Sequence, residues 1–191
     1  MSKILDFEIE NYKGIVKTKI ELAGRIDSPV VTLIGLNESG KTTILEAISQ
    51  FVSSDRSVSS LYFFSPENKD EFSFIPVSRK GGFTGEVSIS ATVVLDPSEV
   101  EEIFTIGESL GVEVDTAALS APFKIIKAIR FKNSEARSSS GSLGFDLKTR
   151  LPGIPDYEIY AQPDDESANL WAIAASLVAN KIPTVAYFQH S

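Results

Sequence analysis

The sequence predicts an α/β fold in which a phosphate-binding loop joins a strand to an amphipathic helix. The apolar, β-branched run over residues 30–34 is typical of a buried strand. Residues 35–42 follow with the sequence Gly-Leu-Asn-Glu-Ser-Gly-Lys-Thr, an unbroken G-x-x-x-x-G-K-T motif. The next residues place one apolar face on a helix, made of Ile44, Leu45, Ala47, Ile48, Phe51 and Val52. We therefore expect a P-loop core in which this strand and helix join a mixed sheet.

The residue types in the loop suit a nucleoside triphosphate. Gly35 and Gly40 allow positive φ and a close approach of the backbone to a ligand. The amides that follow can form a concave nest for an anion at the positive end of the helix dipole. Lys41 would contact the β- and γ-phosphates, and the Thr42 hydroxyl would bind Mg²⁺, so both are candidate catalytic residues. The residues predicted to bind ATP are Gly35, Asn37, Glu38, Ser39, Gly40, Lys41, Thr42 and Thr43.

Two segments also resemble a known family. The pattern G-x-N-x-S-G-K-T-x-x-L-E-A-I over residues 35–48 resembles the N-terminal ATPase segment of the SMC/RecF group of ABC-type ATPases. It looks most similar to the OLD (overcoming lysogenization defect) family and to bacterial anti-phage ATPases. Residues 9–15, Ile-Glu-Asn-Tyr-Lys-Gly-Ile, are similar to the Asn-Phe-Arg-Gly start of that group, with Lys13 in place of arginine. The resemblance covers residues 3–52 closely and residues 72–191 only as a pattern.

This resemblance implies the first part of an ABC-type ATPase head, with Asn11 and Lys13 near the nucleotide. Heads of this type act as nucleotide-sandwiched dimers, so a second ATPase head is the implied partner, in a homodimer or a higher oligomer. The implied roles are DNA repair or anti-phage defence, with DNA as a further partner. Gln189, after the apolar run 184–188, lies where the family's Q-loop glutamine contacts Mg²⁺ and water.

Composition excludes several classes of protein. With 42% apolar and 23% charged residues, the 191-residue chain is expected to be globular, and without cysteine it can form no disulfide or thiolate metal site. No run approaches the ~20 apolar residues of a membrane span, so we expect a cytoplasmic protein without a membrane partner. The net charge of −8 disfavours a generic nucleic-acid binder. Residues 123–150, with seven basic and two acidic side chains, could face DNA, but the solvated face of a hairpin is the favoured interpretation.

The chain divides into a P-loop core (1–53), a β-rich lobe with one helix (54–163), and a helix with a final strand (164–191). Strands are predicted at 3–10, 16–22, 72–77, 85–95, 123–131, 143–149 and 157–161, with 133–144 as a mobile loop. The strands at 85–95, 123–131 and 143–149 are expected to form an antiparallel lobe. Helices are expected at 97–109 and from 164–167 to Pro183, followed by a strand at 184–188.

Two later segments imitate catalytic motifs. The run that ends at Asp96 is similar to a Walker B strand, but Asp96, Pro97 and Glu99 also fit the N-cap, N1 and N3 positions of a helix, which is our interpretation. The alternation of that run further suggests a half-exposed strand rather than a buried central one. The Ser-Gly-Ser at 140–142 resembles an ABC signature, although a hairpin explains it better. We therefore predict that these residues bind ATP with hydrolysis near background.

Two alternative functions stay open. A self-contained P-loop kinase or GTPase would need an internal Walker B or DxxG-type acid, and a GTPase would also need an Asn-Lys-x-Asp base reader. The Asn-Lys-Asp at 68–70 has no following aspartate in register. A nucleotide-gated interaction module without turnover is the second alternative.

Overall fold

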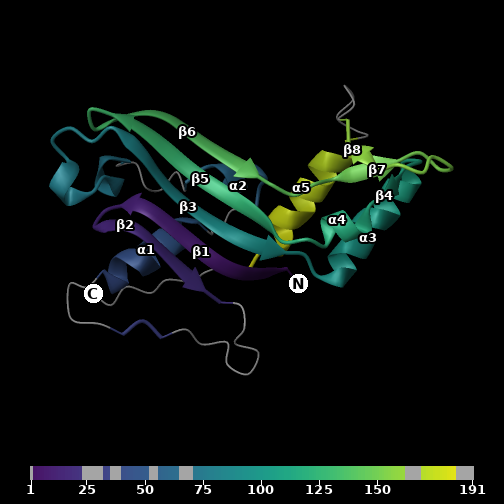
Figure 1. Ribbon diagram of the computed structural model, residues 1–191, viewed down its shortest axis with the longest axis horizontal. Coiled ribbons are helices and arrows are strands. Elements are labelled where there is room, and N and C mark those ends of the chain that lie inside the picture. The colour runs from purple at the N-terminus through teal and green to yellow at the C-terminus, as the bar shows by residue number, and fades with distance from the viewer. Residues whose placement is uncertain are drawn as a thin grey trace.

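A five-stranded sheet, with strand order β2-β1-β3-β5-β6, forms the centre of the molecule (Figure 1). The computed structural model describes residues 2–22, 32–34, 40–51, 56–64, 71–161 and 169–183. Every strand pair in this sheet is antiparallel. An antiparallel arrangement was expected for the strands at 85–95 and 123–131, but not that strands 3–10 and 16–22 of the P-loop core share a sheet with them. Its strands are β1 (Lys3–Tyr12), β2 (Ile15–Glu21), β3 (Gly85–Val94), β5 (Phe123–Lys132) and β6 (Glu135–Leu143).

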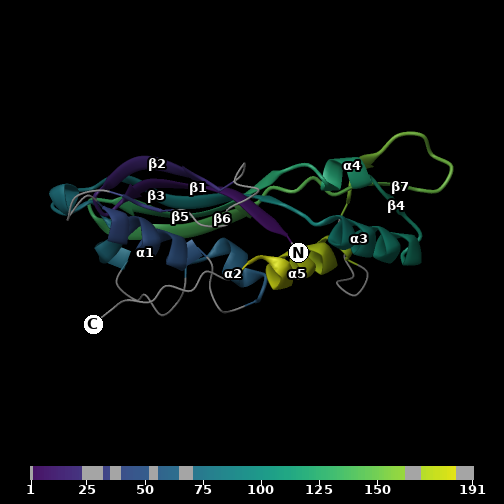
Figure 2. The ribbon, with the colours of Figure 1, turned by 90° about the horizontal axis from the view of Figure 1, so that it is seen from below.

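Three helices cover one face of this sheet, as Figure 2 shows: α1 (Lys41–Phe51), α2 (Ser59–Tyr62) and α5 (Leu170–Lys181). Alternate residues of the strands point towards them, because successive side chains of a strand lie on opposite faces. The Phe7 ring of β1, for example, meets the Phe51 ring of α1 edge-on at 5.5 Å between centroids. The buried apolar side chains on this face of the three inner strands are Phe7, Ile9, Val87, Ile89, Ala91, Val93, Phe123, Ile125, Ile129 and Phe131.

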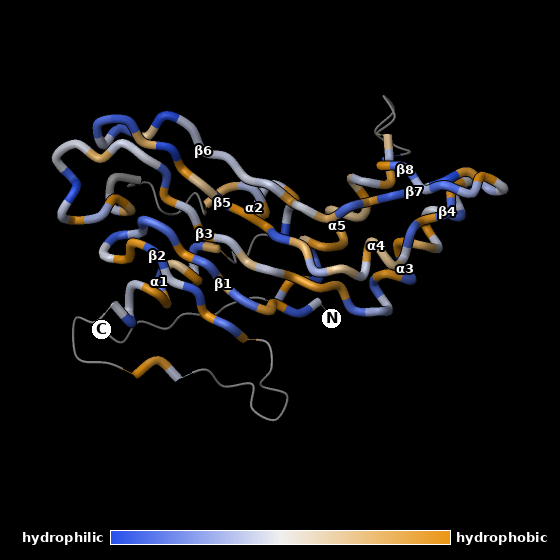
Figure 3. Tube along the Cα trace, in the orientation of Figure 1, coloured by the Kyte–Doolittle hydropathy of each residue, from blue (hydrophilic) through white to orange (hydrophobic). Residues whose placement is uncertain are grey.

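A smaller unit lies at one end of the large sheet (Figure 1). It is a three-stranded antiparallel sheet of order β4-β7-β8, joined to two helices. Its helix α3 packs against α5, which is apolar along most of its length (Figure 3). The elements are α3 (Pro97–Ser109), β4 (Glu113–Val114), α4 (Thr116–Leu119), β7 (Lys148–Arg150) and β8 (Glu158–Ile159). None of the helices in the described ranges is both long and apolar enough to span a membrane.

The ends of the longer helices follow local sequence signals. The helix expected at 97–109 is confirmed as α3, and Gly111 just beyond it has φ +79°. The helix expected to stop at Pro183 is confirmed as α5, which ends at Lys181, although Asn169 caps its start and 164–167 lie outside the described residues. The strands expected at 3–10, 16–22, 85–95 and 123–131 are confirmed as β1, β2, β3 and β5.

Asp96 is the N-cap of α3, as interpreted from the sequence. Its carboxylate accepts a hydrogen bond from the Ser98 amide at 3.1 Å, and the Glu99 carboxylate accepts one from the Asp96 amide at 2.9 Å. Glu99 is buried and also accepts a hydrogen bond from the Ser2 amide at 2.9 Å. This capping box gives the acidic residue a structural role that does not depend on Mg²⁺.

We predict that Asp96→Asn changes the free energy of unfolding by less than ~0.5 kcal/mol, whereas Asp96→Ala costs about 1 kcal/mol, because asparagine also caps helices well. Urea denaturation of the two variants measures the difference. Equal losses in both would contradict the capping role.

Several expectations from the sequence are wrong. The segment 133–144 is not a loop, and the strand placed at 143–149 is instead β6 at Glu135–Leu143, followed by β7. Asn133 and Ser134 have φ of +52° and +65°, which makes a two-residue hairpin that brings this polar segment against β5. Residues 72–77 form one-turn 3-10 helices (Glu71–Phe74 and Val77–Arg79) rather than a strand, and they bury Phe74 and Ile75.

The other two corrections concern burial. β3 is a central strand with neighbours on both sides, contrary to the expectation, although its burial alternates as expected, with Val87, Ile89, Ala91 and Val93 buried and Ser88 and Thr92 partly exposed. Residues 32–34 of the expected buried strand lie outside any strand, and Ile34 is 91% exposed. A buried parallel strand needs partners on both edges, and the strands that the structure describes pair with one another instead.

Four of the seven basic side chains of residues 123–150 form ion pairs with acidic side chains of the same chain. Lys124 pairs with Glu8, Arg130 with Glu86, Arg137 with Glu135 and Arg150 with Glu113, all at 2.7–3.0 Å. Lys127 is buried in the core, with its Nζ 5.2 Å from the centre of the Phe51 ring. These contacts agree with the hairpin interpretation of this stretch.

Lowering the pH should reduce the free energy of unfolding, because the Glu8 carboxylate in the large sheet becomes protonated. Hydrogen bonds from Lys17 and Lys124 lower the pKa of Glu8 from 4.5 to about 2. A carboxyl group with a depressed folded-state pKa stabilises the fold above its unfolded value and loses that contribution as pH falls. We expect Glu8→Gln to flatten the loss of stability between pH 4.5 and about 2. Urea midpoints at a series of pH values measure this, with exposed Glu101→Gln as the control; an unchanged pH profile in Glu8→Gln would contradict it.

Candidate functional site

Helix α1 begins at the lysine of the P-loop motif. The Ile44 amide donates to the Gly40 carbonyl at 2.9 Å, so Gly40 is the N-cap and Lys41 is the first helical residue. The amides from Gly40 to Thr43 therefore have no acceptor within the helix. Gly40 has φ +86°, a left-handed conformation that favours glycine. The described part of the motif, residues 40–42, thus has the positive φ at Gly40 that the sequence predicts.

The start of α1 is suited to an anion. Its first turn contains no acidic residue, so the helix itself does not offset the positive end of its dipole. Thr42 is exposed and Lys41 is half-buried at this end. Of the other predicted residues, Gly35, Asn37, Glu38, Ser39 and Gln189 lie outside the described residues.

The apolar face of α1 packs largely as expected. Ala47 and Phe51 are buried, and Ile44 and Ile48 pack against the core. Leu45, which was assigned to this face, is 42% exposed. The helix is thereby held against β1 and β3, while Thr42 in its first turn is exposed.

The turn between β1 and β2 lies beside α1. The Lys13 ammonium is 2.6 Å from the Glu46 carboxylate, while Phe7 at the other part of β1 meets Phe51. Helix α1 and β1 are therefore antiparallel, and the turn lies towards the start of α1. Glu46 is five residues beyond Lys41, which corresponds to roughly 7.5 Å along the helix axis. This places Lys13 near the end of α1 that would hold the phosphates.

Several contacts fix the conformation of this turn. Lys13 has φ +51°, and its amide donates to the Phe74 carbonyl at 2.8 Å. The adjacent Tyr12 is buried with its ring 5.4 Å from that of Phe74. Burial, and to a lesser extent the Glu46 carboxylate, raises the pKa of Tyr12, so the phenol stays neutral. The backbone of the turn that carries Lys13 is therefore fixed by a hydrogen bond and by the packing of Tyr12 on Phe74.

Asn11, which the resemblance implies to lie near the nucleotide, contacts the neighbouring strand β3. Its side-chain amide donates to the Glu86 carbonyl at 2.9 Å, which ties β1 to β3. It also borders a cavity of about 430 Å³ at the β1–β2 turn, to which Arg79 adds a second cation besides Lys13. Arg79 was not among the predicted site residues, because no motif in the neighbouring sequence indicates a binding site. The cavity is lined by Asn11, Lys13, Gly14, Ile15, Val16, Pro76, Val77, Ser78 and Arg79.

The Lys13–Glu46 pair should couple the turn to α1 energetically. Because both side chains are partly buried, we expect a double-mutant cycle with Lys13→Met and Glu46→Gln to give a coupling free energy of about 0.5–1 kcal/mol in urea denaturation. The more exposed pair Arg137–Glu135, treated in the same way, should give a value near zero. Equal coupling in the two pairs would show that the Lys13–Glu46 contact has no special structural role.

A comparison with known protein families matches residues 2–162 to the AAA ATPase domain. This match contains the P-loop motif, the β1–β2 turn and the whole large sheet. The chain belongs to the AAA ATPase domain family. No curated protein sequence matches the chain significantly.

An AAA ATPase domain binds a nucleotide, usually with Mg²⁺. The site described above is compatible with this, because the first turn of α1 has amides with no acceptor within the helix, Thr42 offers an exposed hydroxyl and the Lys13–Glu46 pair lies beside the helix. The described ranges contain no group of three or more His, Cys, Asp or Glu side chains placed to bind a metal. Asp96, the residue most similar to a Walker B acid, caps α3.

Proposed function

We propose that this AAA ATPase domain is the ATP-binding part of an SMC/RecF/OLD-like ATPase that acts in DNA repair or anti-phage defence. The observation that carries the ATP site is the start of α1 at Lys41, directly after the left-handed Gly40. The narrower family and the DNA-related role are supported by the motif pattern over 35–48 and by Lys13 in the first turn.

Each residue of the site has a distinct task in this proposal. The amides at the start of α1 bind phosphate oxygens, and Lys41 offsets the charge of the β- and γ-phosphates. The Thr42 hydroxyl holds Mg²⁺, and the remaining amides of the loop complete the cradle. ATP supplies a phosphoanhydride bond whose cleavage develops charge on the γ-phosphate. Lys13 lies beside α1 at the edge of the site, where its ammonium pairs with Glu46.

Hydrolysis is proposed to depend on a second ATPase head. Phosphoryl transfer needs charge around the γ-phosphate and an oriented water, beyond a phosphate cradle. Asp96 is committed to the capping box of α3, so it is not offered to a metal at this site. By family resemblance the partner head supplies the other wall of the site, and DNA is the further partner.

The experiment that tests this proposal measures binding and turnover on the same preparation. Calorimetric titration with ATP and Mg²⁺ should give saturable binding, and a phosphate-release assay should stay at background. Sustained turnover at the ~1 s⁻¹ or more typical of enzymes would contradict the need for a second head. Absence of ATP binding would overturn the proposed site itself.

A further inference from the structure

The negative charge of the chain is concentrated in one part of the fold. Residues 96–122 and 144–161, here called the acidic lobe, contain α3, β4, α4, β7 and β8, and the pairing of β4 with β7 joins the two segments. The acidic lobe has ten acidic and two basic side chains, a net charge of −8, which equals that of the whole chain. The other residues have sixteen acidic and sixteen basic side chains and are neutral.

An exposed apolar group lies at the end of the acidic lobe. Leu151 is 62% exposed, Ile154 is 51% exposed and Ile159 is 78% exposed, and Pro152 and Pro155 between them are exposed as well. We call these five residues the apolar tip. Figure 3 shows apolar colour in the loop that projects beyond β7. Ile159 lies on β8, where it pairs with Lys148 of β7, and the other four residues lie in the loop that joins these strands. Single exposed apolar residues are common, whereas several on one short hairpin favour an interaction surface.

The apolar tip is held in a defined conformation. Residues 151–154 form a type II turn, with Gly153 at φ +87° and the Ile154 amide donating to the Leu151 carbonyl at 3.0 Å. The Arg150 guanidinium donates to Glu113 at 2.7 Å and to the Pro155 carbonyl at 3.2 Å, and it lies 4.5 Å from the centre of the Tyr157 ring. A surface that is already ordered loses little conformational entropy on binding.

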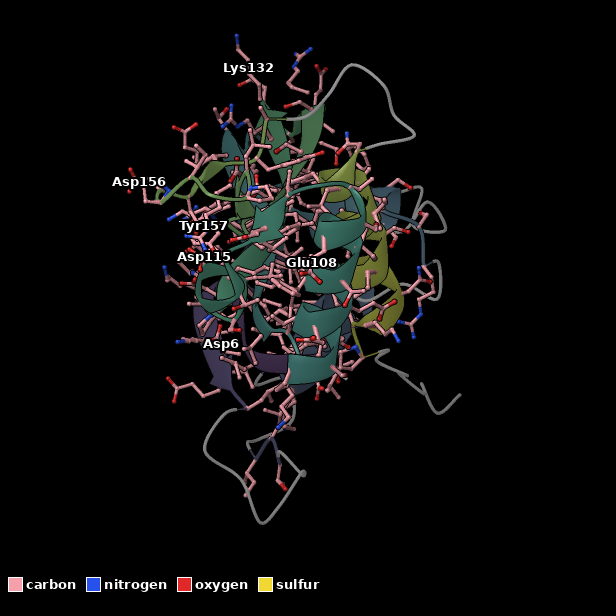
Figure 4. All side chains as sticks on the ribbon, turned by 90° about the vertical axis from the view of Figure 1, so that its right-hand side faces the viewer. Asp6, Glu108, Asp115, Lys132, Asp156 and Tyr157 are labelled. Carbon is pink, nitrogen blue, oxygen red and sulfur yellow. The ribbon has the colours of Figure 1, made fainter. Side chains whose placement is uncertain are left out.

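The charges around the tip indicate the chemistry of a partner. Arg150 is one of only two basic residues in the acidic lobe, and its charge is matched by Glu113. Figure 4 views the molecule from this end and shows Glu108, Asp115 and Asp156 on it, with Asp156 projecting beside Tyr157. A negative field of this kind repels nucleic acid and attracts basic polypeptides.

We propose that the acidic lobe binds a basic segment of a protein partner, whose apolar side chains cover Leu151, Ile154 and Ile159. Charge would steer the partner to the lobe, and burial of the tip would hold it. A second copy of this chain is disfavoured as the occupant, because two lobes of the same sign repel and the remainder of the chain is neutral. This inference is independent of the ATP site.

Selection from a display library of random linear peptides on the 191-residue chain tests the proposal. The library is first depleted on the Leu151→Ser/Ile154→Ser/Ile159→Ser variant, so that the retained peptides depend on the tip. We expect retained peptides that combine Lys or Arg with large apolar residues. A synthetic retained peptide should bind the variant about tenfold or more weakly, as loss of anchor residues usually does. Binding should also weaken as salt rises from ~0.01 to ~0.15 M, since the Debye length falls from roughly 30 to roughly 8 Å.

Two controls make the outcome decisive. Phe63→Ser removes a side chain that is 49% exposed outside the acidic lobe, and it should leave peptide binding unchanged. An unchanged circular dichroism spectrum and a cooperative thermal transition of the triple variant show that it is folded. The proposal is overturned if no peptide depends on the tip, if the retained peptides lack basic residues, or if salt has no effect. It is also overturned if sedimentation shows a dimer of the wild type that the triple variant does not form.

Discussion

Replacing Lys41 by alanine is expected to weaken ATP–Mg²⁺ binding roughly 10- to 100-fold in calorimetric titration, the equivalent of ~1.5–3 kcal/mol for a charge-assisted hydrogen bond. The side chain is the first of α1, next to the amides of the first helical turn. Its loss removes the charge that faces the β- and γ-phosphates but leaves the backbone cradle in place. Residual weak binding is therefore expected rather than none.

The matched control for this prediction is Lys132→Ala, which removes the same charge from an exposed position at the end of β5. It should leave ATP affinity unchanged. Equal affinity of wild type and Lys41→Ala would contradict the assignment of Lys41 to the phosphates. Equal weakening by both variants would mean that only the overall charge matters.

Replacing Gly141 by alanine is expected to destabilise the fold by about 1–3 kcal/mol, as overpacking of a close contact usually does. A Cβ at Gly141 would lie 2.7 Å from the Tyr62 carbonyl carbon and closer still to the Tyr62 Cα and oxygen. These are backbone atoms of α2, so no side-chain rotation can relieve the clash. The melting temperature should fall by ~2–4 °C for each kcal/mol in a chain of this size.

Gly82→Ala provides the control, because a Cβ at Gly82 meets nothing within 4 Å. It should be neutral or slightly stabilising, since alanine lowers the entropy of the unfolded chain. An unchanged melting temperature in Gly141→Ala would show that α2 does not pack on β6 in this way.

The segment around Gly141 also illustrates why part of the fold was predicted incorrectly. A Ser-Gly-Ser run has the composition of a loop, or of a nucleotide signature, when only neighbouring residues are considered. Its place in an edge strand is decided by pairing with β5 and by the Asn133–Ser134 turn. The residues at 72–77 were misassigned for a related reason, because Phe74 packs on Tyr12 and Phe64 through contacts distant in the chain.

The correctly predicted elements are those with local signals. The capping residues of α3, the glycine at 111 and the proline at 183 each act within a turn of the helix that they bound. The alternating strands β1, β2, β3 and β5 were likewise visible as patterns of period two. Asp96 caps α3 as predicted, but β3 before it is a central strand, which the alternation of its side chains did not reveal.

In the candidate site, too, features with local sequence signals were predicted, and features that depend on contacts distant in the chain were not. The motif predicted a helix after the loop and a positive φ at Gly40, and the structure has α1 beginning at Lys41 directly after the left-handed Gly40. The Lys13–Glu46 pair joins residues 33 apart in sequence, and only the antiparallel packing of α1 on β1 brings them together. Arg79 reaches the cavity through a 3-10 helix that the sequence did not indicate.

Backbone amide chemical shifts during a titration with ATP and Mg²⁺ test the central claim most directly. If the phosphates bind at the start of α1, the largest changes should fall on the amides of Gly40, Lys41 and Thr42, with smaller changes at Lys13. Changes confined to other elements, with these amides unaffected at saturation, would contradict the proposed nucleotide site.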